Sequence, residues 1–225
     1  MKTVSIIIAR GGSKGIPKKN IMNFCGRPLI TWTINQSLQS ELIDEVYVST
    51  DSYEIADIAY DNGAKIIIRP NYLATDKATS EDVILHALER IDCDTVVFPQ
   101  VTSPIRNSID FTKAIDIFNE KMLSSLFTST YLDDYCIWNS KFQSVTYDYL
   151  NRGRRQDRES TFLENGSFYI FKPEGIKQFK NRIHGKVGMY FMPFWKSYEI
   201  DSYENIEICE YYMNTKILGK KVKYE

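Results

Sequence analysis

The sequence has few cysteines, no long apolar run and almost no net charge, and each of these absences excludes a class of protein. Its cysteines are widely separated and form no CxxC pair, so we expect neither a disulfide framework nor a zinc site and predict free, buried thiols. The apolar runs are all shorter than the ~20 residues that span a bilayer, and no signal-peptide pattern precedes the first predicted strand. These features favour a soluble, cytoplasmic protein. The four cysteines are Cys25, Cys93, Cys136 and Cys209.

The charge balance excludes binding through an overall electrostatic field. With 28 Lys and Arg against 29 Asp and Glu, the formal net charge is −1, which attracts neither nucleic acid nor an anionic membrane. Any basic site must therefore be local. The length of 225 residues and the hydrophobic fraction of 43% suit one large domain with a sizeable core, and we predict a single domain over residues 1–225.

Strand and helix patterns alternate through the first 130 residues of the chain. This alternation is typical of a parallel sheet with helices on both faces, so we expect a three-layer, Rossmann-like α/β fold. In such sheets ligands bind beyond the carboxyl ends of the strands, where residues 10–20, 50–51, 69 and 100–103 are expected to meet. The predicted strands are residues 3–9, 45–49, 64–68, 95–98 and 125–129, and the predicted helices are residues 28–40, 53–61, 83–91 and 108–121.

Three local signals support the helix boundaries. Pro28 suits the first turn of a helix. The pair Asn62-Gly63 is a helix-stop signal. Thr79 and Asp82 have the spacing of a capping box, which predicts a helix start beside them.

The alternating pattern breaks between residues 132 and 162, where Tyr, Asp and Arg are frequent and no period is evident. A loop of this length usually has a function, and we predict an arm at roughly residues 130–165 that packs on a second subunit. After the arm, strands are expected over residues 164–172 and 186–193, and a last helix over residues 202–214.

The segment IIIARGGSKGIPKKN, residues 6–20, ends a buried strand with glycines and a cluster of cations. Gly11 and Gly12 allow a tight turn and a close backbone approach to an oxyanion, and the cations would neutralise a polyphosphate. The spacing fits neither GxxxxGK[ST] nor GxGxxG, which excludes a P-loop NTPase and a dinucleotide-binding turn. A solvated basic loop is the alternative. The cations are Arg10, Lys14, Lys18 and Lys19.

Residues 9–20, ARGGSKGIPKKN, resemble the signature of the acylneuraminate cytidylyltransferase (CMP-sialic acid synthetase) family. Further stretches that resemble this family extend over essentially the whole chain. The related CMP-KDO synthetases carry a different version of the first signature, which favours the nonulosonate branch. The further stretches are RP and DKATS within residues 69–80, PQVTSPIR at 99–106, RRQ at 154–156, ENGSFY at 164–169 and EIDS at 199–202.

The resemblance implies transfer of CMP from CTP to the anomeric hydroxyl of N-acylneuraminate, with release of pyrophosphate and with Mg²⁺ as cofactor. It implies catalytic roles for Arg10, Lys19 and Asp201, and metal binding by Asp201 with Glu199. It also implies a homodimer, in which an arginine of the arm reaches the sugar carboxylate of the neighbouring subunit. The implied CTP-binding residues are Arg10, Gly11, Gly12, Ser13, Lys14, Lys19, Asn20, Arg69, Thr79 and Ser80. The implied sugar-binding residues are Gln100, Arg154, Arg155, Asn165 and Tyr169.

Several of these residues also have a simpler structural interpretation. Thr79 could serve only as a helix cap. Arg154 and Arg155 could belong to a solvated charge run. Asp201 could cap the last helix, a role for which Ser202 competes.

Two departures from the family pattern leave alternatives open. Glu199 stands where the family has aspartate, and Asp157-Arg158 replaces a leucine-proline pair. Both departures are compatible with a nucleotide-sugar-binding protein that has lost catalysis. Another alternative keeps the chemistry and uses legionaminate or another relative of sialic acid. Asp51 suits either ligand binding or a turn, and no general base is identified.

Overall fold

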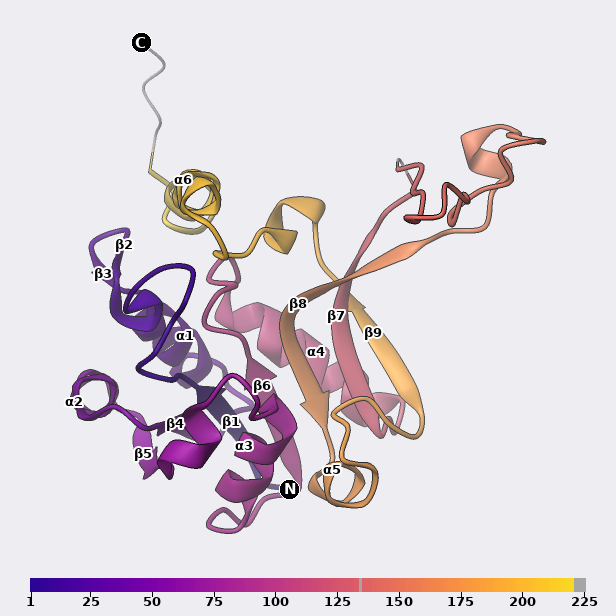
Figure 1. Ribbon diagram of the computed structural model, residues 1–225. Coiled ribbons are helices and arrows are strands. Elements are labelled where there is room, and N and C mark those ends of the chain that lie inside the picture. The colour runs from indigo at the N-terminus through magenta and orange to yellow at the C-terminus, as the bar shows by residue number, and fades with distance from the viewer. Residues whose placement is uncertain (134, 221–225) are drawn as a thin grey trace.

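A seven-stranded sheet runs through the centre of the computed structural model, which describes residues 1–133 and 135–220 (Figure 1). Residue 134, inside the predicted arm, and residues 221–225, at the end of the predicted domain, lie outside the described residues. The strand order is β5-β4-β1-β6-β8-β7-β9, and β2 pairs with β3 in a separate ribbon. The strands are β1 (Thr3–Ile8), β2 (Asn23–Phe24), β3 (Arg27–Pro28), β4 (Glu45–Thr50), β5 (Lys65–Ile68), β6 (Thr95–Pro99), β7 (Ser125–Tyr131), β8 (Phe162–Phe171) and β9 (Val187–Phe191).

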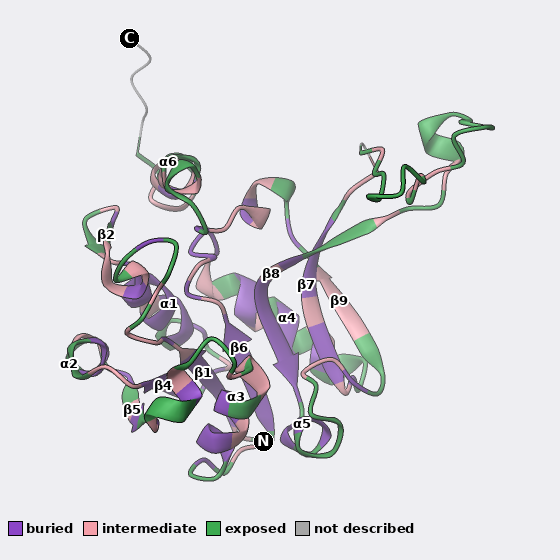
Figure 2. Ribbon diagram, in the orientation of Figure 1, coloured by how far each residue is buried: buried purple, intermediate pink, exposed green. Residues whose placement is uncertain are grey.

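Helices cover both faces of this sheet, whose strands are largely buried (Figure 2). Helices α3 and α5 pack on one face, and α1, α2, α4 and α6 contribute to the core on the other. Ile6 and Ile7 are both fully buried because they point to opposite, covered faces, which explains the unbroken apolar run of β1. No helix in the described part of the chain is long and apolar enough to cross a bilayer. The helices are α1 (Leu29–Leu38), α2 (Tyr53–Asp61), α3 (Ser80–Leu88), α4 (Ser108–Glu120), α5 (Pro173–Phe179) and α6 (Tyr203–Tyr212).

The order of the strands reverses direction at β1. The chain first adds β4 and then β5 on one side of β1, both in parallel pairing, and then crosses over to add β6 in parallel on the other side. A reversal of this kind leaves a crevice beyond the carboxyl ends of the two central strands. The predicted ligand-binding edge of the sheet therefore lies above β1 and β6.

Strand β8 departs from the predicted parallel sheet, because it pairs antiparallel with both β6 and β7. The chain leaves β7 through the arm and returns directly beside it, and such a return forces antiparallel pairing. The register between β7 and β8 shifts between Phe127 and Ser129, and Gly166 in β8 has a φ of +65°. The sheet is mostly parallel, and the α/β prediction is confirmed with this exception.

The local helix signals act as the sequence predicts. Helix α2 spans the predicted residues, and Gly63 behind it has a φ of +88°, which glycine adopts without strain. The capping box is confirmed, since the Thr79 hydroxyl accepts a hydrogen bond from the Asp82 N–H at 3.1 Å. Helix α3 therefore begins directly after Thr79, earlier than the predicted residue 83.

Other local predictions need correction. Pro28 is the N-cap of α1, with φ −55° and ψ 135°, and does not lie in the first turn. The last α-helix ends at Tyr212, before the predicted residue 214, and a π-helical turn, Met213–Ile217, follows it directly. All four cysteines are free as predicted, but only Cys209 is buried and the other three are half-buried. Helix α5 was not predicted, because a helix this short leaves too few turns for a clear period.

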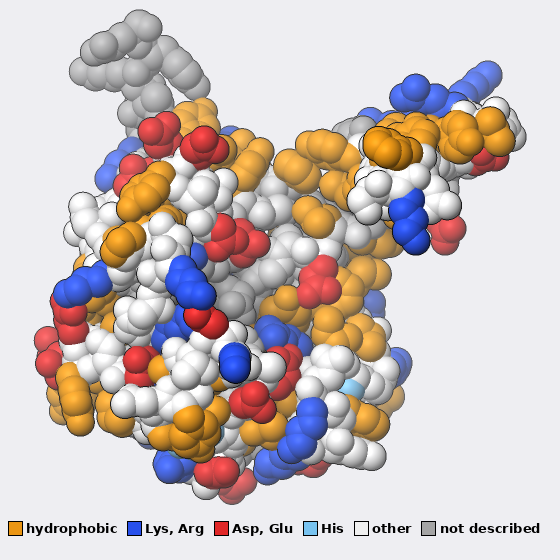
Figure 3. All heavy atoms as spheres, in the orientation of Figure 1, with side chains coloured by type: hydrophobic (Ala, Val, Ile, Leu, Met, Phe, Trp, Pro, Cys, Tyr) orange, Lys and Arg blue, Asp and Glu red, His pale blue; other side chains and the backbone are white. Residues whose placement is uncertain are grey.

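The described part of residues 132–161 forms an arm that projects away from the body of the molecule (Figure 1). Its regular structure in this part is a short 3₁₀ turn, Arg155–Asp157, and an isolated bridge between Trp138 and Ser144. Hydrophobic side chains crowd its surface (Figure 3), with Phe142 86% and Leu150 83% exposed. A projecting segment thus lies at the position predicted for the arm, and its apolar surface is solvent-exposed in the single chain.

Candidate functional site

A cleft of about 520 Å³ opens at the carboxyl ends of β1 and β6. Its walls come from segments far apart in sequence: the loop after β1, the residues after β5, the start of α3, the residue after β6 and the segment before α6. The sequence analysis placed its binding loops at this edge. The predicted site residues that line the cleft are Arg10, Ser13, Lys14, Lys19, Asn20, Arg69, Thr79, Ser80, Gln100 and Asp201.

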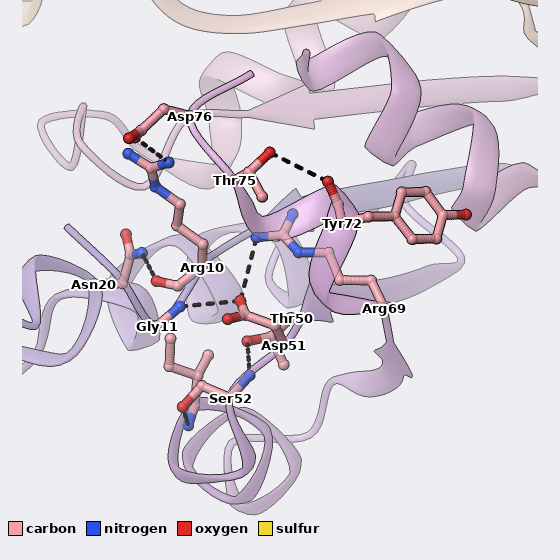
Figure 4. A network of polar contacts seen from close by, with 11 residues as sticks. Arg10, Gly11, Asn20, Thr50, Asp51, Ser52, Arg69, Tyr72, Thr75 and Asp76 are labelled. Atoms are coloured by element: carbon pink, nitrogen blue, oxygen red, sulfur yellow. Dashed lines mark hydrogen bonds and ion pairs between the residues drawn. The ribbon is translucent and has the colours of Figure 1, made fainter. Parts of the chain in front are cut away.

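Two cations of the first loop meet at Asp76, the first residue of the DKATS stretch, which the sequence analysis did not include among the implied site residues. Arg10 Nη1 lies 2.8 Å from Asp76 Oδ1 (Figure 4). Lys14 Nζ lies 2.6 Å from Asp76 Oδ2. These hydrogen bonds hold the pKa of Asp76 below its usual value. The loop itself is fixed by Asn20, whose side-chain amide donates to the Arg10 carbonyl at 2.9 Å. Arg10 and Lys14 therefore share one anionic partner at the cleft.

Lys19 joins the loop to the opposite wall of the cleft. Its ammonium donates to the Ile200 carbonyl at 3.0 Å and to Asp201 Oδ1 at 3.1 Å, and only 17% of its side chain is exposed. Lys18 behaves differently, because it pairs with Glu54 at 2.7 Å and does not line the cleft. Of the cations in this loop, Arg10, Lys14 and Lys19 face the cleft and Lys18 does not.

The two glycines of the loop have different surroundings. A Cβ on Gly11 would lie 3.1 Å from the Ser52 Cβ, whereas a Cβ on Gly12 would meet nothing within 4 Å. Neither glycine has a positive φ, so Gly11 is needed for close approach and not for backbone geometry. The Gly11 N–H already donates to Asp51 Oδ1 at 3.1 Å (Figure 4), and neither glycine is among the residues lining the cleft.

Arg69 is the buried cation of the cleft, only 4% exposed. Its Nη2 lies 3.6 Å from Asp51 Oδ1, so Asp51 serves to hold Gly11 and Arg69 together (Figure 4). Burial lowers the pKa of Arg69, and the charge of Asp51 opposes this effect. The Arg69 Nε has no hydrogen-bond partner among the described residues. A buried donor without a partner is costly, and a polar ligand in the cleft could satisfy it.

Polar groups without partners also gather where β6 and β8 adjoin. The Gln100 N–H donates to the Ser167 carbonyl at 3.0 Å, which holds the two residues side by side. Among the described residues, Gln100 Nε2, Asn165 Nδ2 and Ser167 Oγ are buried and have no partner. Of these three residues, Gln100 lines the cleft and the other two lie on β8 beside it. Unpartnered donors of this kind suit the hydroxyl and carbonyl oxygens of a sugar.

Tyr169 lies deeper than the sequence analysis expected. It is 8% exposed and does not line the cleft, and its hydroxyl donates to Glu164 Oε1 at 2.6 Å. Burial is the largest cause of its raised pKa, and the hydrogen bond to Glu164 adds to it. The phenol is therefore neutral and already has a partner within the chain.

Arg106 ends the PQVTSPIR stretch, but the sequence analysis assigned no role to it. It is fully buried, and its guanidinium donates to the Gln100 carbonyl at 3.0 Å, to the Ser103 carbonyl and to the Ser167 carbonyl at 3.3 Å. A further bond reaches the Thr33 hydroxyl at 2.8 Å, and burial lowers the pKa of Arg106 to about 9. Arg106 fixes the loop that presents Gln100. A cation inside the apolar stretch PIR was the signal that could have identified it.

Glu199 and Asp201 form the acidic part of the site. Burial raises the pKa of Glu199, and the charge of Asp201 raises it further, so the two carboxylates are close enough to repel. Glu199 Oε2 lies 3.5 Å from the Ser103 hydroxyl. The helix cap is Ser202, in a capping box with Asn205, so the alternative in which Asp201 caps α6 is wrong.

This carboxylate pair fits a hard divalent cation. A cation between two repelling carboxylates relieves their repulsion, and Mg²⁺ needs only one or two carboxylates when water and phosphate oxygens supply the other ligands. The described residues contain no group of three or more His, Cys, Asp or Glu side chains that could hold a metal by itself. The donor set thus suits Mg²⁺ held jointly with a phosphate ligand.

Arg154 and Arg155 lie outside the cleft. Both are exposed on the arm, where they border separate hollows from the one between β1 and β6. Within one chain they do not join Gln100 and Asn165.

Known proteins resemble this chain over most of its length. A family model described as cytidylyltransferase matches residues 4–216. N-acylneuraminate cytidylyltransferase A of Danio rerio is 35% identical over 182 residues, which are 77% of this chain and 42% of that protein. Pseudaminic acid cytidylyltransferase of Campylobacter jejuni is 34% identical over 182 residues, which are 76% of this chain and 78% of that protein. The chain thus spans less than half the length of the Danio relative.

A solved structure supports the architecture independently. The structure of CMP:2-keto-3-deoxy-manno-octonic acid synthetase complexed with CTP superposes with a TM-score of 0.72, over 95% of this chain and 98% of that one. The two sequences are 15% identical, so this likeness concerns the fold alone. It confirms the predicted three-layer α/β architecture.

Proposed function

The chain belongs to the cytidylyltransferase family, and from this premise we propose that it transfers CMP from CTP to the anomeric hydroxyl of N-acylneuraminate, with release of pyrophosphate. The observation that carries the proposal is the contact between Lys19 and Asp201. There a loop of cations suited to a triphosphate touches a carboxylate suited to a divalent cation, and both line one cleft. Phosphoryl transfer needs these two elements at the same place.

The nucleotide is proposed to bind along the side of the cleft formed by Arg10, Lys14, Arg69 and the start of α3. The cations Arg10 and Lys14 would exchange Asp76 for phosphate oxygens, and the unpartnered Arg69 Nε would donate to the nucleotide. The N-terminus of α3 adds free backbone N–H groups, which favour anions. Thr79 contributes through its position, since its hydroxyl is used in the capping box. The predicted contacts of Gly11, Gly12, Ser13, Asn20 and Ser80 with CTP remain part of this proposal.

The chemical step is proposed to be an in-line attack of the anomeric hydroxyl on the α-phosphorus. A new oxygen–phosphorus bond forms, and the bond from the α-phosphorus to pyrophosphate breaks. We propose that Lys19, together with Arg10, neutralises the charge that develops on the α-phosphate, which is supported by the position of both cations in the cleft and by the contact of Lys19 with Asp201. Asp201 and Glu199 would hold Mg²⁺, which supplies further positive charge and lowers the pKa of the attacking hydroxyl.

The acceptor is proposed to bind against Gln100, Asn165 and Tyr169. The side-chain amide nitrogens of Gln100 and Asn165, which have no partner among the described residues, support this placement. A second candidate acceptor is pseudaminate, because the C. jejuni relative matches over three quarters of both chains. Legionaminate is a further sialic-acid-like candidate.

The arm is proposed to complete the site of a second subunit in a homodimer. Arg154 and Arg155 project from the body on an arm with an exposed apolar surface, and within one chain they border no part of the cleft. A guanidinium is suited to the sugar carboxylate because it can bind both oxygens. Light scattering of the purified protein at several concentrations would reveal the dimer, and a monomeric mass throughout would contradict it.

A cytoplasmic location is also proposed. The four cysteines are free, and three of them are only half-buried, which suits a reducing compartment. Fractionation of cells that produce the protein would check this.

Pyrophosphate release from CTP and Mg²⁺ is the experiment that tests the function. The acceptors are N-acetylneuraminate, pseudaminate, legionaminate, KDO and none, with ATP, GTP and UTP as control nucleotides. Release only with CTP and one nonulosonate establishes both reaction and acceptor. CTP binding without release for any acceptor would instead favour a nucleotide-sugar-binding protein that has lost catalysis.

Lys14 and Lys18 offer a matched pair for testing the phosphate loop. Both are exposed lysines of the same loop, but Lys14 faces the cleft and Lys18 pairs with Glu54. We expect Lys14→Ala to raise the KM for CTP about five- to tenfold, because it loses a charge-assisted phosphate contact. Lys18→Ala should leave this KM unchanged. Equal effects of both substitutions would contradict a phosphate contact at Lys14.

The raised pKa of Glu199 predicts a pH-dependent requirement for Mg²⁺. Protonation of Glu199 competes with the cation, and because the pKa is raised, this competition begins at a higher pH than for an ordinary glutamate. The Mg²⁺ concentration that gives half-maximal rate should therefore rise as the pH falls through this pKa and stay constant above it. Mg²⁺ titrations across a pH series would measure this.

Glu199→Gln is the control for this prediction, because glutamine has the same length and does not titrate. Protonation of the nucleotide affects both proteins equally, so it cancels in the ratio of their half-maximal Mg²⁺ concentrations. The variant should need more Mg²⁺ at every pH but show a weaker pH dependence. Parallel pH curves for the two proteins would exclude Glu199 as the titrating group.

A further inference from the structure

An ion pair outside the cleft connects its two sides. Arg182 Nε lies 2.6 Å from Glu81 Oε1, and Arg182 Nη2 lies 3.1 Å from Glu81 Oε2, so the contact is bidentate. Only 20% of the Arg182 side chain and 17% of the Glu81 side chain are exposed. Glu81 stands in the first turn of α3, next to the cleft residue Ser80. The arginine thus holds the helix start that forms the nucleotide side of the cleft.

The same guanidinium lies over an aromatic pair formed by Tyr169 of β8 and Phe98 of β6. Its carbon is 4.9 Å from the centroid of the Tyr169 ring and 5.0 Å from that of Phe98. These two residues are register partners of β8 and β6, with ring centroids 6.1 Å apart. A cation over two ring faces is attracted by both, and Arg is well suited because its planar group stacks. Arg182 therefore sets the position of the Tyr169 ring.

The loop that carries Arg182 is firmly attached. The Ser125 hydroxyl donates to the His184 carbonyl at 2.7 Å, and the His184 N–H lies 2.9 Å from the same hydroxyl oxygen. The His184 ring packs against Gly175 of α5 so closely that a Cβ there would lie 1.7 Å from its Nε2. Helices α3 and α5 also pack side by side on this face of the sheet (Figure 1). Arg182 thus reaches Glu81 and Tyr169 from a rigid support.

We propose that Arg182 is a positioning residue that couples the nucleotide side of the cleft, through Glu81, to the acceptor side, through Tyr169. This rests on the proposed function, in which α3 contacts CTP and Tyr169 supports the sugar acid. The guanidinium also neutralises Glu81, whose carboxylate would otherwise stand beside the phosphate-binding start of α3. Loss of Arg182 misplaces the Tyr169–Glu164 pair and uncouples the two substrates, while Lys19 and Asp201 stay in place.

Steady-state kinetics of Arg182→Ala test this coupling. With the acceptor that the wild type uses, we expect the acceptor KM to rise about tenfold, a factor typical of linked sites, while kcat changes less than about threefold. CTP binding measured by calorimetry without acceptor should weaken much less. Arg182→Lys keeps the charge and loses the bidentate contact, so it should restore only part of the acceptor KM.

A matched control and a double variant separate coupling from general destabilisation. Arg90 is also an arginine paired with a glutamate, Glu89, the C-cap residue of α3, at 3.4 Å, and it does not line the cleft, so Arg90→Ala should leave both KM values unchanged. Adding Glu81→Gln to Arg182→Ala should produce less than the sum of the single effects.

Three outcomes would overturn the inference. An acceptor KM that stays at the wild-type value in Arg182→Ala excludes the coupling. Equal increases in both KM values, accompanied by a lower melting temperature in Arg182→Ala and Arg182→Lys, indicate a merely structural contact. A wild type that binds CTP but releases no pyrophosphate with any acceptor refutes the proposed function instead, and the inference fails with its premise.

Discussion

Lys19→Ala is expected to lower kcat for pyrophosphate release about a thousandfold, the upper range for removing one donor that stabilises transition-state charge. The Lys19 ammonium is only partly exposed and lies between the cation loop and Asp201, where charge develops in the proposed reaction. Its effect should fall mainly on kcat, because Arg10, Lys14 and Arg69 still bind the ground-state triphosphate. Rapid-quench kinetics with saturating CTP and acceptor would measure the chemical step directly.

Lys18→Ala is the control, since its side chain pairs with Glu54 and leaves the cleft unchanged. Lys19→Arg tests whether charge alone suffices, and it should recover only part of the rate because the larger fork cannot reach the Ile200 carbonyl and Asp201 in the same way. A loss confined to KM would contradict the assignment of Lys19 to the α-phosphate.

Asp201→Asn is expected to reduce the rate at least about a hundredfold and to raise the Mg²⁺ requirement strongly. Asparagine retains the shape but loses the charge that suits a hard cation. The melting temperature should stay close to that of the wild type, because 65% of the Asp201 side chain is exposed and Ser202 provides the helix cap. Activity measured over a Mg²⁺ series, together with a thermal melt, separates the two effects.

Glu204→Gln is the matched control for Asp201→Asn, because it removes an exposed carboxylate from the first turn of α6 that does not line the cleft. It should keep full activity. If Asp201→Asn retained wild-type rates at limiting Mg²⁺, the metal role of Asp201 would be refuted.

The features of the fold that depend on residues close together in the sequence were predictable from the sequence. The alternation of β-branched runs with helical segments indicated the α/β class, and the Thr79–Asp82 capping box and Gly63 marked helix ends through local hydrogen bonds and backbone conformation. The direction of β8 was not predictable in this way. It depends on how the chain returns from the arm, and no local pattern records that path.

The same distinction between local and long-range contacts applies to the residues of the candidate site. The cation loop is contiguous, so its cleft-facing residues could be proposed from one segment of sequence. Asp76 and Arg106 lie in stretches that the sequence analysis quoted, but their contacts were not foreseen, and Arg182 was missed altogether, because each gains its role through partners distant in sequence, such as Arg10 for Asp76 and Glu81 for Arg182. The surroundings of the two glycines were also beyond the sequence pattern: Gly11 is closely packed against Ser52, whereas Gly12 faces open space.

Strand β8 belongs to two parts of the molecule at once. Phe162 at its start pairs with Tyr131 at the root of the arm, and Tyr169 near its end pairs with Phe98 of β6. The register shift opposite Gly166 lies between these two regions and gives the strand a local bend. The bend lies beside Asn165 and Glu199. The arm is therefore joined to Asn165 and Tyr169 by one continuous, hydrogen-bonded strand.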